Sequence, residues 1–127
     1  MRFTHSSYTI ASGGTITFEK GPQDMTPDPH TLTVVKPSQV PKTPLQVELC
    51  LGDTPGTGCA IGDSAKGPVL NAGKPGFNEP GDSYGLFPSK TGKYAPLSIK
   101  VTAAPGTTLN FMCAVHPWMQ AVLHVVQ

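Results

Sequence analysis

Glycine and proline recur along the whole chain and limit the secondary structure that it can form. Each occurs 14 times in 127 residues. Because both residues disfavour helix interiors, the sequence indicates many turns and few long helices. The length is enough to bury one hydrophobic core and too short for two ordinary domains. We therefore expect one domain over residues 1–127, of the all-β class.

Alternating polar and apolar residues mark the expected strands. Such alternation is typical of strands with one buried face. The expected strands are residues 14–19, 31–36, 45–49, 96–102, 107–113 and 120–126. We expect the last three to be antiparallel and the whole domain to be a Greek-key β-sandwich.

The middle of the chain, residues 51–96, has a different character. It contains ten Gly and six Pro in 46 residues, with weak strand signals at 69–70 and 83–87. Structureless segments of this length are uncommon in compact domains. We expect an irregular excursion within the single domain, anchored on the sandwich by its larger apolar side chains. These are Leu70, Phe77, Tyr84, Leu86 and Phe87.

Two of the three cysteines, Cys50 and Cys59, lie in a glycine-rich segment that folds back easily. A disulfide between them is the natural interpretation, and it would contribute roughly 2–3 kcal/mol in the chain-entropy model. The alternative is a pair of free, buried thiols. Because disulfides persist mainly outside the reducing cytosol, the pair favours an extracytoplasmic protein, in the periplasm or on the outer face of the cell membrane. Cys113 is left over and needs another explanation, such as a metal.

Charge and hydropathy exclude two classes of partner. Charged residues are 13% of the chain and the formal net charge is +1, which excludes a nucleic-acid binder because such proteins need clustered Lys and Arg. No apolar run approaches the roughly 20 residues of a membrane-spanning helix. The first six residues also lack the apolar stretch of a secretion signal. We expect either a cytosolic protein or a mature exported form with an added Met1.

The segment 113–119 carries the strongest chemical signal. It places Cys113, His116 and Met119 in a C-x2-H-x2-M pattern between two expected strands. Thiolate, imidazole and thioether together suit copper, whereas structural zinc makes little use of thioether. A second imidazole is available from His30, which stands just before the strand at 31–36. In a Greek-key sandwich this strand entrance can lie beside the loop that joins the last two strands.

With these residues, the chain resembles the cupredoxin family of small blue copper proteins. The resemblance covers about residues 8–36 and 96–127, and the short ligand loop is similar to that of amicyanin more than to the longer loops of plastocyanin and azurin. The resemblance implies one type 1 copper ion. Its close ligands would be His30, Cys113 and His116, with Met119 as a weak axial ligand.

Neighbouring residues would support such a site. If Cys113 points inward, alternation turns Phe111 and Leu109 inward and Met112 and Asn110 outward. Pro117 restricts the backbone at His116.

Two further residues lie next to the expected ligands in the sequence. Several cupredoxins have Asn directly after the first His ligand, where its side chain ties the ligand loops together. Here the residue is Thr31, whose hydroxyl could replace part of that network. Trp118 has two functional interpretations, an apolar lid over the metal or a surface for partner docking, beside ordinary packing.

The expected function is a one-electron shuttle between protein redox partners through the edge of His116. Such a protein would be monomeric and not an enzyme. The alternative is a copper carrier or storage module that hands over the metal. A metal-free adhesion domain and a domain of a larger oxidase remain further alternatives.

Overall fold

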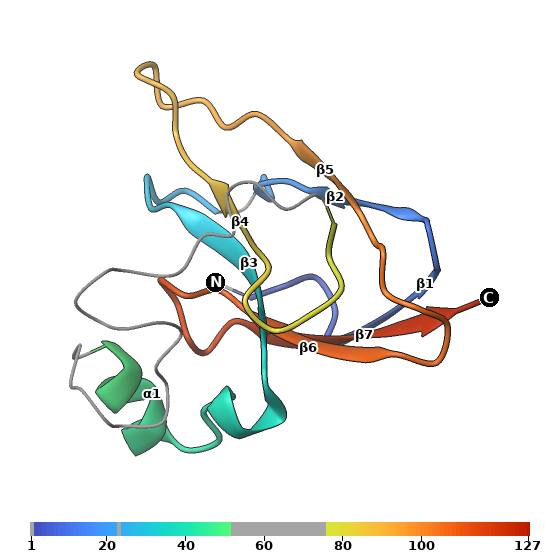
Figure 1. The fold of residues 1–127 in the computed structure, drawn as a ribbon. Helices are drawn as coiled ribbons and strands as arrows, with labels where there is room; N and C mark the ends of the chain where they lie inside the picture. The colour runs from blue at the N-terminus through green and yellow to red at the C-terminus, as the bar shows by residue number, and fades with distance from the viewer. Residues whose placement is uncertain (1, 23, 52–75) are drawn as a thin grey trace.

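Two β-sheets packed against each other make up the fold. The computed structural model describes residues 2–22, 24–51 and 76–127. The larger sheet has the strand order β1 (Ser7–Ala11), β7 (Gln120–Val126), β6 (Thr108–Met112), β3 (His30–Val35), β4 (Ser83–Leu86). The smaller sheet pairs β2 (Thr15–Phe18) with β5 (Leu97–Lys100). Figure 1 shows this pair lying over one side of the larger sheet.

Alternating strand residues fill the space between the sheets. Along β7, Ala121, Leu123 and Val125 are buried while the residues between them are more exposed. They join Phe18 of β2 and Ile99 of β5 in one hydrophobic core. Burying such side chains from both sheets is the main force that holds the layers together. The predicted all-β sandwich is confirmed.

The strand pairing differs from the prediction at β5. β6 and β7 form an antiparallel pair, as expected, but β5 is antiparallel to β2 in the smaller sheet. The chain crosses between the sheets after Lys100, where Ala103 is buried in the core and the Thr107 amide donates to the Ala104 carbonyl in a turn. The last three strands are therefore not consecutive neighbours in one sheet.

The strand expected at residues 45–49 is wrong, because this segment belongs to helix α1 (Pro44–Leu51). Local capping explains the helix. The Gln46 amide donates to the Thr43 hydroxyl at 3.2 Å, and Gln46 Oε1 accepts from the Lys42 amide at 2.7 Å. Proline in the first helical position is already set at a helical φ. A short 3-10 helix, η1 (Pro37–Gln39), lies between β3 and α1.

The described part of the middle segment, from residue 76 onward, is attached to the larger sheet. β4 pairs antiparallel with β3, and Phe77 and Leu86 are buried in the core. Tyr84 is partly buried and its hydroxyl donates to the Gly76 carbonyl, whereas Phe87 is 54% exposed. The predicted anchoring is therefore correct for Phe77, Leu86 and Tyr84, and Phe87 contributes in part, because its ring lies over Gly85 of β4.

Other predictions for this region fall on residues 52–75. Leu70, the strand signal at 69–70 and Cys59 all lie outside the described residues. Cys113 is free and buried, and the Cys50–Cys59 disulfide stays a prediction.

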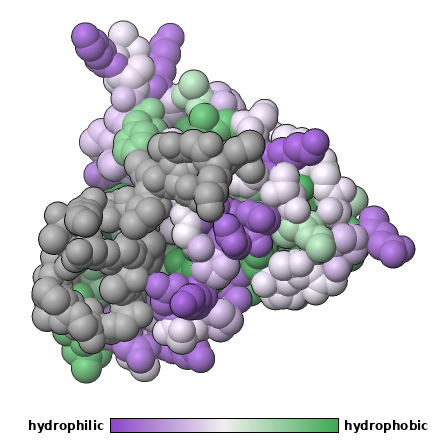
Figure 2. Space-filling view, viewed as in Figure 1, coloured by the Kyte–Doolittle hydropathy of each residue, from purple (hydrophilic) through white to green (hydrophobic). Residues whose placement is uncertain are grey.

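The described surface on the side shown in Figure 2 is largely hydrophilic or weakly polar, with hydrophobic residues in small separate groups. No helix within the described ranges is both long and apolar enough to cross a membrane.

Candidate metal centre

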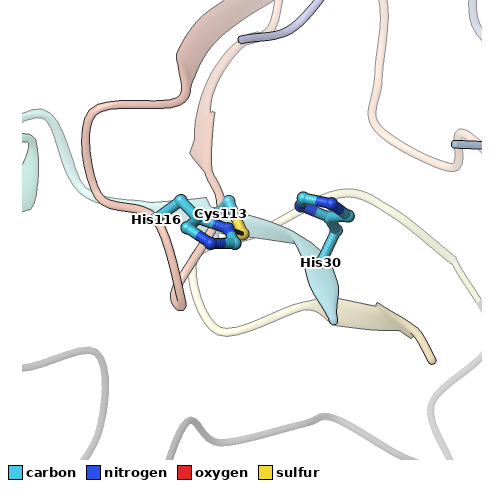
Figure 3. Close-up of side chains that lie close together, drawn as sticks. All are labelled: His30, Cys113 and His116. Carbon is cyan, nitrogen blue, oxygen red and sulfur yellow. Dashed lines mark hydrogen bonds between the residues drawn. The ribbon is translucent and has the colours of Figure 1, made fainter. Parts of the chain in front are cut away.

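Three of the four predicted ligands converge at one end of the larger sheet. His30 begins β3, and Cys113 and His116 lie in the loop that follows β6. Their ligand atoms all lie within 4.8 Å of one another, and all three residues are buried. Figure 3 shows the three side chains close together, with His30 on its strand and the other two on the loop. This arrangement fits the ligand set that the cupredoxin resemblance implies.

Cys113 owes its position to the strand that precedes it. Leu109 and Phe111 are buried in the core, as alternation predicts, and Cys113 is fully buried. Met112, expected to point outward, is fully buried as well. Its partner in β7 is Gln120, whose amide side chain donates to the Pro41 carbonyl. This hydrogen bond places the segment around Pro41 at the same end of the sheet as Met112. Alternation along β6 does not predict that contact.

Thr31 connects the strand of His30 with the loop that carries Cys113 and His116. Its amide lies 3.3 Å from Cys113 Sγ and donates to it, and its hydroxyl accepts from the Ala114 amide at 2.7 Å. The same hydroxyl is hydrogen-bonded to the Thr33 hydroxyl, and the Thr33 hydroxyl is hydrogen-bonded to the Ser83 hydroxyl on β4. The hydroxyl of Thr31 thus ties the start of β3 to the loop that follows β6.

Backbone hydrogen bonds close the ligand loop. The Cys113 amide donates to the Met119 carbonyl at 2.9 Å, and the Met119 amide donates to the His116 carbonyl at 2.8 Å. Pro117 is fully buried, and its carbonyl accepts from the Gln120 side chain at 2.8 Å. Met119 is buried with 6% exposure. Its role as a weak axial ligand stays a prediction.

The two nitrogens of His30 have different surroundings. Nε2 lies 2.7 Å from Oδ2 of Asp24, whereas Nδ1 is buried and has no hydrogen-bond partner within the described residues. Burial opposes ionisation of Asp24, but hydrogen bonds from Thr26 and His30 and the charge of Lys20 outweigh it and lower the Asp24 pKa. A buried polar atom without a partner is costly, and a bound metal would satisfy Nδ1.

His116 lies between the cysteine and the surface. Its Nδ1 is 3.6 Å from Cys113 Sγ, and its Nε2 is 3.9 Å from Oδ2 of Asp28. Burial and the neighbouring His30 lower the pKa of His116, against a smaller opposing effect of Asp28. A lower pKa favours the neutral imidazole, which has a lone pair for a metal. The ring of Trp118, which is 45% exposed, lies 5.2 Å from that of His116 in an edge contact.

Chemically, this is a compact set of one cysteine sulfur and two imidazoles away from bulk water. Such donors suit copper and zinc. Sequence reasoning missed the two carboxylates near the histidine Nε2 atoms, those of Asp24 at 2.7 Å from His30 and Asp28 at 3.9 Å from His116. The available signal was the segment before His30, which places Asp24 and Asp28 among three prolines.

No sequence model of a known protein family matches this chain, and no curated protein matches it. Among solved structures, the chain is similar to sodium-dithionite-reduced auracyanin from the photosynthetic bacterium Roseiflexus castenholzii, with 20% sequence identity and a TM-score of 0.48. The matched region covers 99% of this chain and 88% of the auracyanin chain.

Proposed function

We propose that this chain binds one copper ion and carries single electrons between protein redox partners. His30, Cys113 and His116 would be the close ligands and Met119 the weak axial one. The observation that carries the proposal is the buried Cys-His-His cluster, whose ligand atoms lie within 4.8 Å of one another. The Nδ1 atom of His30, which has no hydrogen-bond partner in the part of the chain that the structure describes, supports it further. Two imidazoles and a thiolate with a distant thioether are typical of blue copper sites.

The surrounding bonds support an electron carrier because they hold the ligands independently of the metal. Bound copper would supply the one-electron couple. The protein must then keep its ligands nearly fixed in both oxidation states. The Ala114 amide is held by Thr31, and the Met119 backbone closes the loop on Cys113 and His116. Little in this loop has to move when the charge of the site changes.

The environment of the sulfur also suits a redox centre. Cys113 is fully buried, so water is kept from its thiolate, and the Thr31 amide donates to Sγ. Hydrogen bonds to the sulfur and the apolar surroundings are the features that tune the reduction potential of blue copper sites. The chain would therefore act as a carrier and not as an enzyme.

The surface beside His116 is the proposed route for electrons. Trp118 contacts the His116 ring and is 45% exposed, and Val115 is 37% exposed. Exposed apolar and aromatic side chains are favourable places for a transient protein contact. We expect the protein to be a monomer and to lie outside the cytoplasm. It would contact its redox partners through the surface around Trp118 and Val115.

Visible absorption of the copper-loaded protein tests the ligand assignment. The wild-type protein should show an intense band from the copper–thiolate bond, and Cys113→Ser should abolish it. The double variant Cys50→Ser and Cys59→Ser, which removes the predicted disulfide without leaving a free thiol and leaves Cys113 unchanged, should keep the band. An intense band in Cys113→Ser would refute the assignment.

Met119→Gln should keep the band and lower the reduction potential, because the amide oxygen is a harder ligand that favours Cu(II).

The carrier or storage alternative is separated by metal exchange. An electron carrier should hold copper in both oxidation states and undergo reversible reduction. A protein that rapidly gives up copper to a chelator in either state would instead support the handover of metal.

A further inference from the structure

The outer nitrogen of His30 is held by a carboxylate from a different segment. Asp24 lies six residues earlier, in the loop before β3, and its Oδ2 is 2.7 Å from His30 Nε2. Because a carboxylate only accepts hydrogen bonds, Nε2 carries the proton and donates it. In the neutral ring the lone pair is then on Nδ1, the buried atom that has no hydrogen-bond partner among the described residues.

Asp24 is itself fixed before it contacts the histidine. Its other oxygen, Oδ1, accepts from the Thr26 amide at 3.1 Å and from the Thr26 hydroxyl at 2.8 Å. The Lys20 ammonium donates to the Thr26 carbonyl and so holds the same turn. The Asp24 side chain is 17% exposed. One carboxylate oxygen is therefore occupied by the loop, and the other is left for His30.

Resting on the proposed copper site, we infer that Asp24 is the positioning residue of the metal centre, which orients His30 through Nε2 and lowers the reduction potential of bound copper. A carboxylate behind a ligating imidazole fixes its tautomer and makes the ligand nitrogen more basic. The negative charge also stabilises the more highly charged Cu(II) more than Cu(I), by Coulomb attraction.

Asp28 provides an internal comparison because it is a second carboxylate on the same loop. Its Oδ2 is 3.9 Å from His116 Nε2, too long for a hydrogen bond, and its side chain is 46% exposed. Asp28→Asn removes the same formal charge as Asp24→Asn. Unlike Asp24→Asn, it does not alter a hydrogen bond to a histidine. Comparing the two variants separates the hydrogen bond on His30 from general electrostatics.

Voltammetry of the copper-loaded proteins measures the first consequence. Asp24→Asn should shift the reduction potential to a more positive value, by more than Asp28→Asn does. Loss of a carboxylate partner of a ligating histidine should also weaken Cu(II) binding by roughly 10- to 100-fold. Equal shifts in the two variants, or no shift in Asp24→Asn, would overturn the inference. Circular dichroism checks that both variants keep the β fold.

NMR of the metal-free protein measures the second consequence without any copper. In the wild type, the ring nitrogens of His30 should report the tautomer with the proton on Nε2, and Asp24→Asn should reduce its share. A wild-type His30 with the proton on Nδ1 would overturn the positioning role. Failure of the wild type to bind copper would refute the proposed function instead, and the NMR result would still decide how His30 is oriented.

Discussion

At the scale of single residues, Thr31 makes two hydrogen bonds to the loop that carries Cys113 and His116. Its side chain is 1% exposed, its amide faces the sulfur and its hydroxyl faces the next residue of the ligand loop. The Ala114 amide is partly buried, so losing its acceptor should destabilise the fold by about 1–1.5 kcal/mol. Thr31 therefore links the position of His30 to the position of Cys113.

Replacing Thr31 with valine tests this link. Valine keeps the shape of the side chain but removes the acceptor of the Ala114 amide. We expect the Ala114 amide proton of the metal-free protein to exchange with solvent about 10-fold faster or more. NMR-detected hydrogen exchange measures this rate.

Thr31→Ser is the matched control, since it keeps the hydroxyl and loses only a methyl group. It should leave exchange at Ala114 close to that of the wild type. The same rate in the valine variant and the wild type would show that the hydroxyl does not hold the loop.

Residue type and spacing predict the sulfur and imidazole groups of the site, but not the carboxylate that is hydrogen-bonded to His30. The three residues of the cluster stand out because cysteine and histidine are rare and bind metals. Cys113 and His116 are also close together in the sequence, and His30 stands just before an expected strand. Asp24 carries no such signal, because an aspartate in a proline-rich loop is usually solvated. Met112 shows a related limit, since alternation assigns a residue to a face and does not say whether that face is covered.

At the scale of elements, the error at residues 45–49 has a local cause. Leu45, Val47 and Leu49 alternate with polar residues, and over so few residues this pattern does not distinguish a strand from a helix. The decisive signal is the capping sequence at Thr43, Pro44 and Gln46. β1 was missed for a different reason. Its parallel partner is β7 at the other end of the chain, and no short-range pattern indicates that pairing.

The turn between β1 and β2 offers a prediction at this scale, since it carries the chain from the larger sheet to the smaller one. A Cβ atom on Gly14 would lie 2.9 Å from the Ala11 carbonyl oxygen and 2.7 Å from Ile10 Cγ1. Gly14→Ala should therefore lower the free energy of unfolding by about 1–3 kcal/mol, as overpacking does elsewhere. Urea denaturation measures the change.

Gly21→Ala is the control for this turn, because a Cβ atom there would meet nothing within 4 Å. It should change the free energy of unfolding by less than about 1 kcal/mol. Equal losses in the two variants would show that crowding at Gly14 is not the cause.

At the scale of the whole molecule, the site depends on pairing between distant parts of the chain. β3 and β6 are antiparallel neighbours, with Thr33 opposite Met112, and this register brings Thr31 beside Ala114. Five of the strands, β2, β3, β5, β6 and β7, could be predicted from alternation, and the sandwich from the number and length of the expected strands. The register could not, because it is set by the packing of both sheets rather than by any local segment.

Because the predicted ligands come from β3 and from the loop after β6, which lie far apart in the sequence, metal binding should stabilise the whole domain. A ligand that binds only the folded state adds about 4 kcal/mol when its free concentration is a thousand times its dissociation constant. We expect calorimetry to show a higher unfolding temperature for the copper-loaded protein than for the metal-free one. The gain should be largely lost in His30→Ala. An equal gain in that variant would indicate copper binding elsewhere.

The contact between Trp118 and His116 has a practical consequence. Trp118 is the single tryptophan of the chain, and its ring lies 5.2 Å from the imidazole. All indole fluorescence therefore originates at the edge of the cluster. Its emission serves as a built-in probe of events beside His116, with no label attached and no background from a second indole.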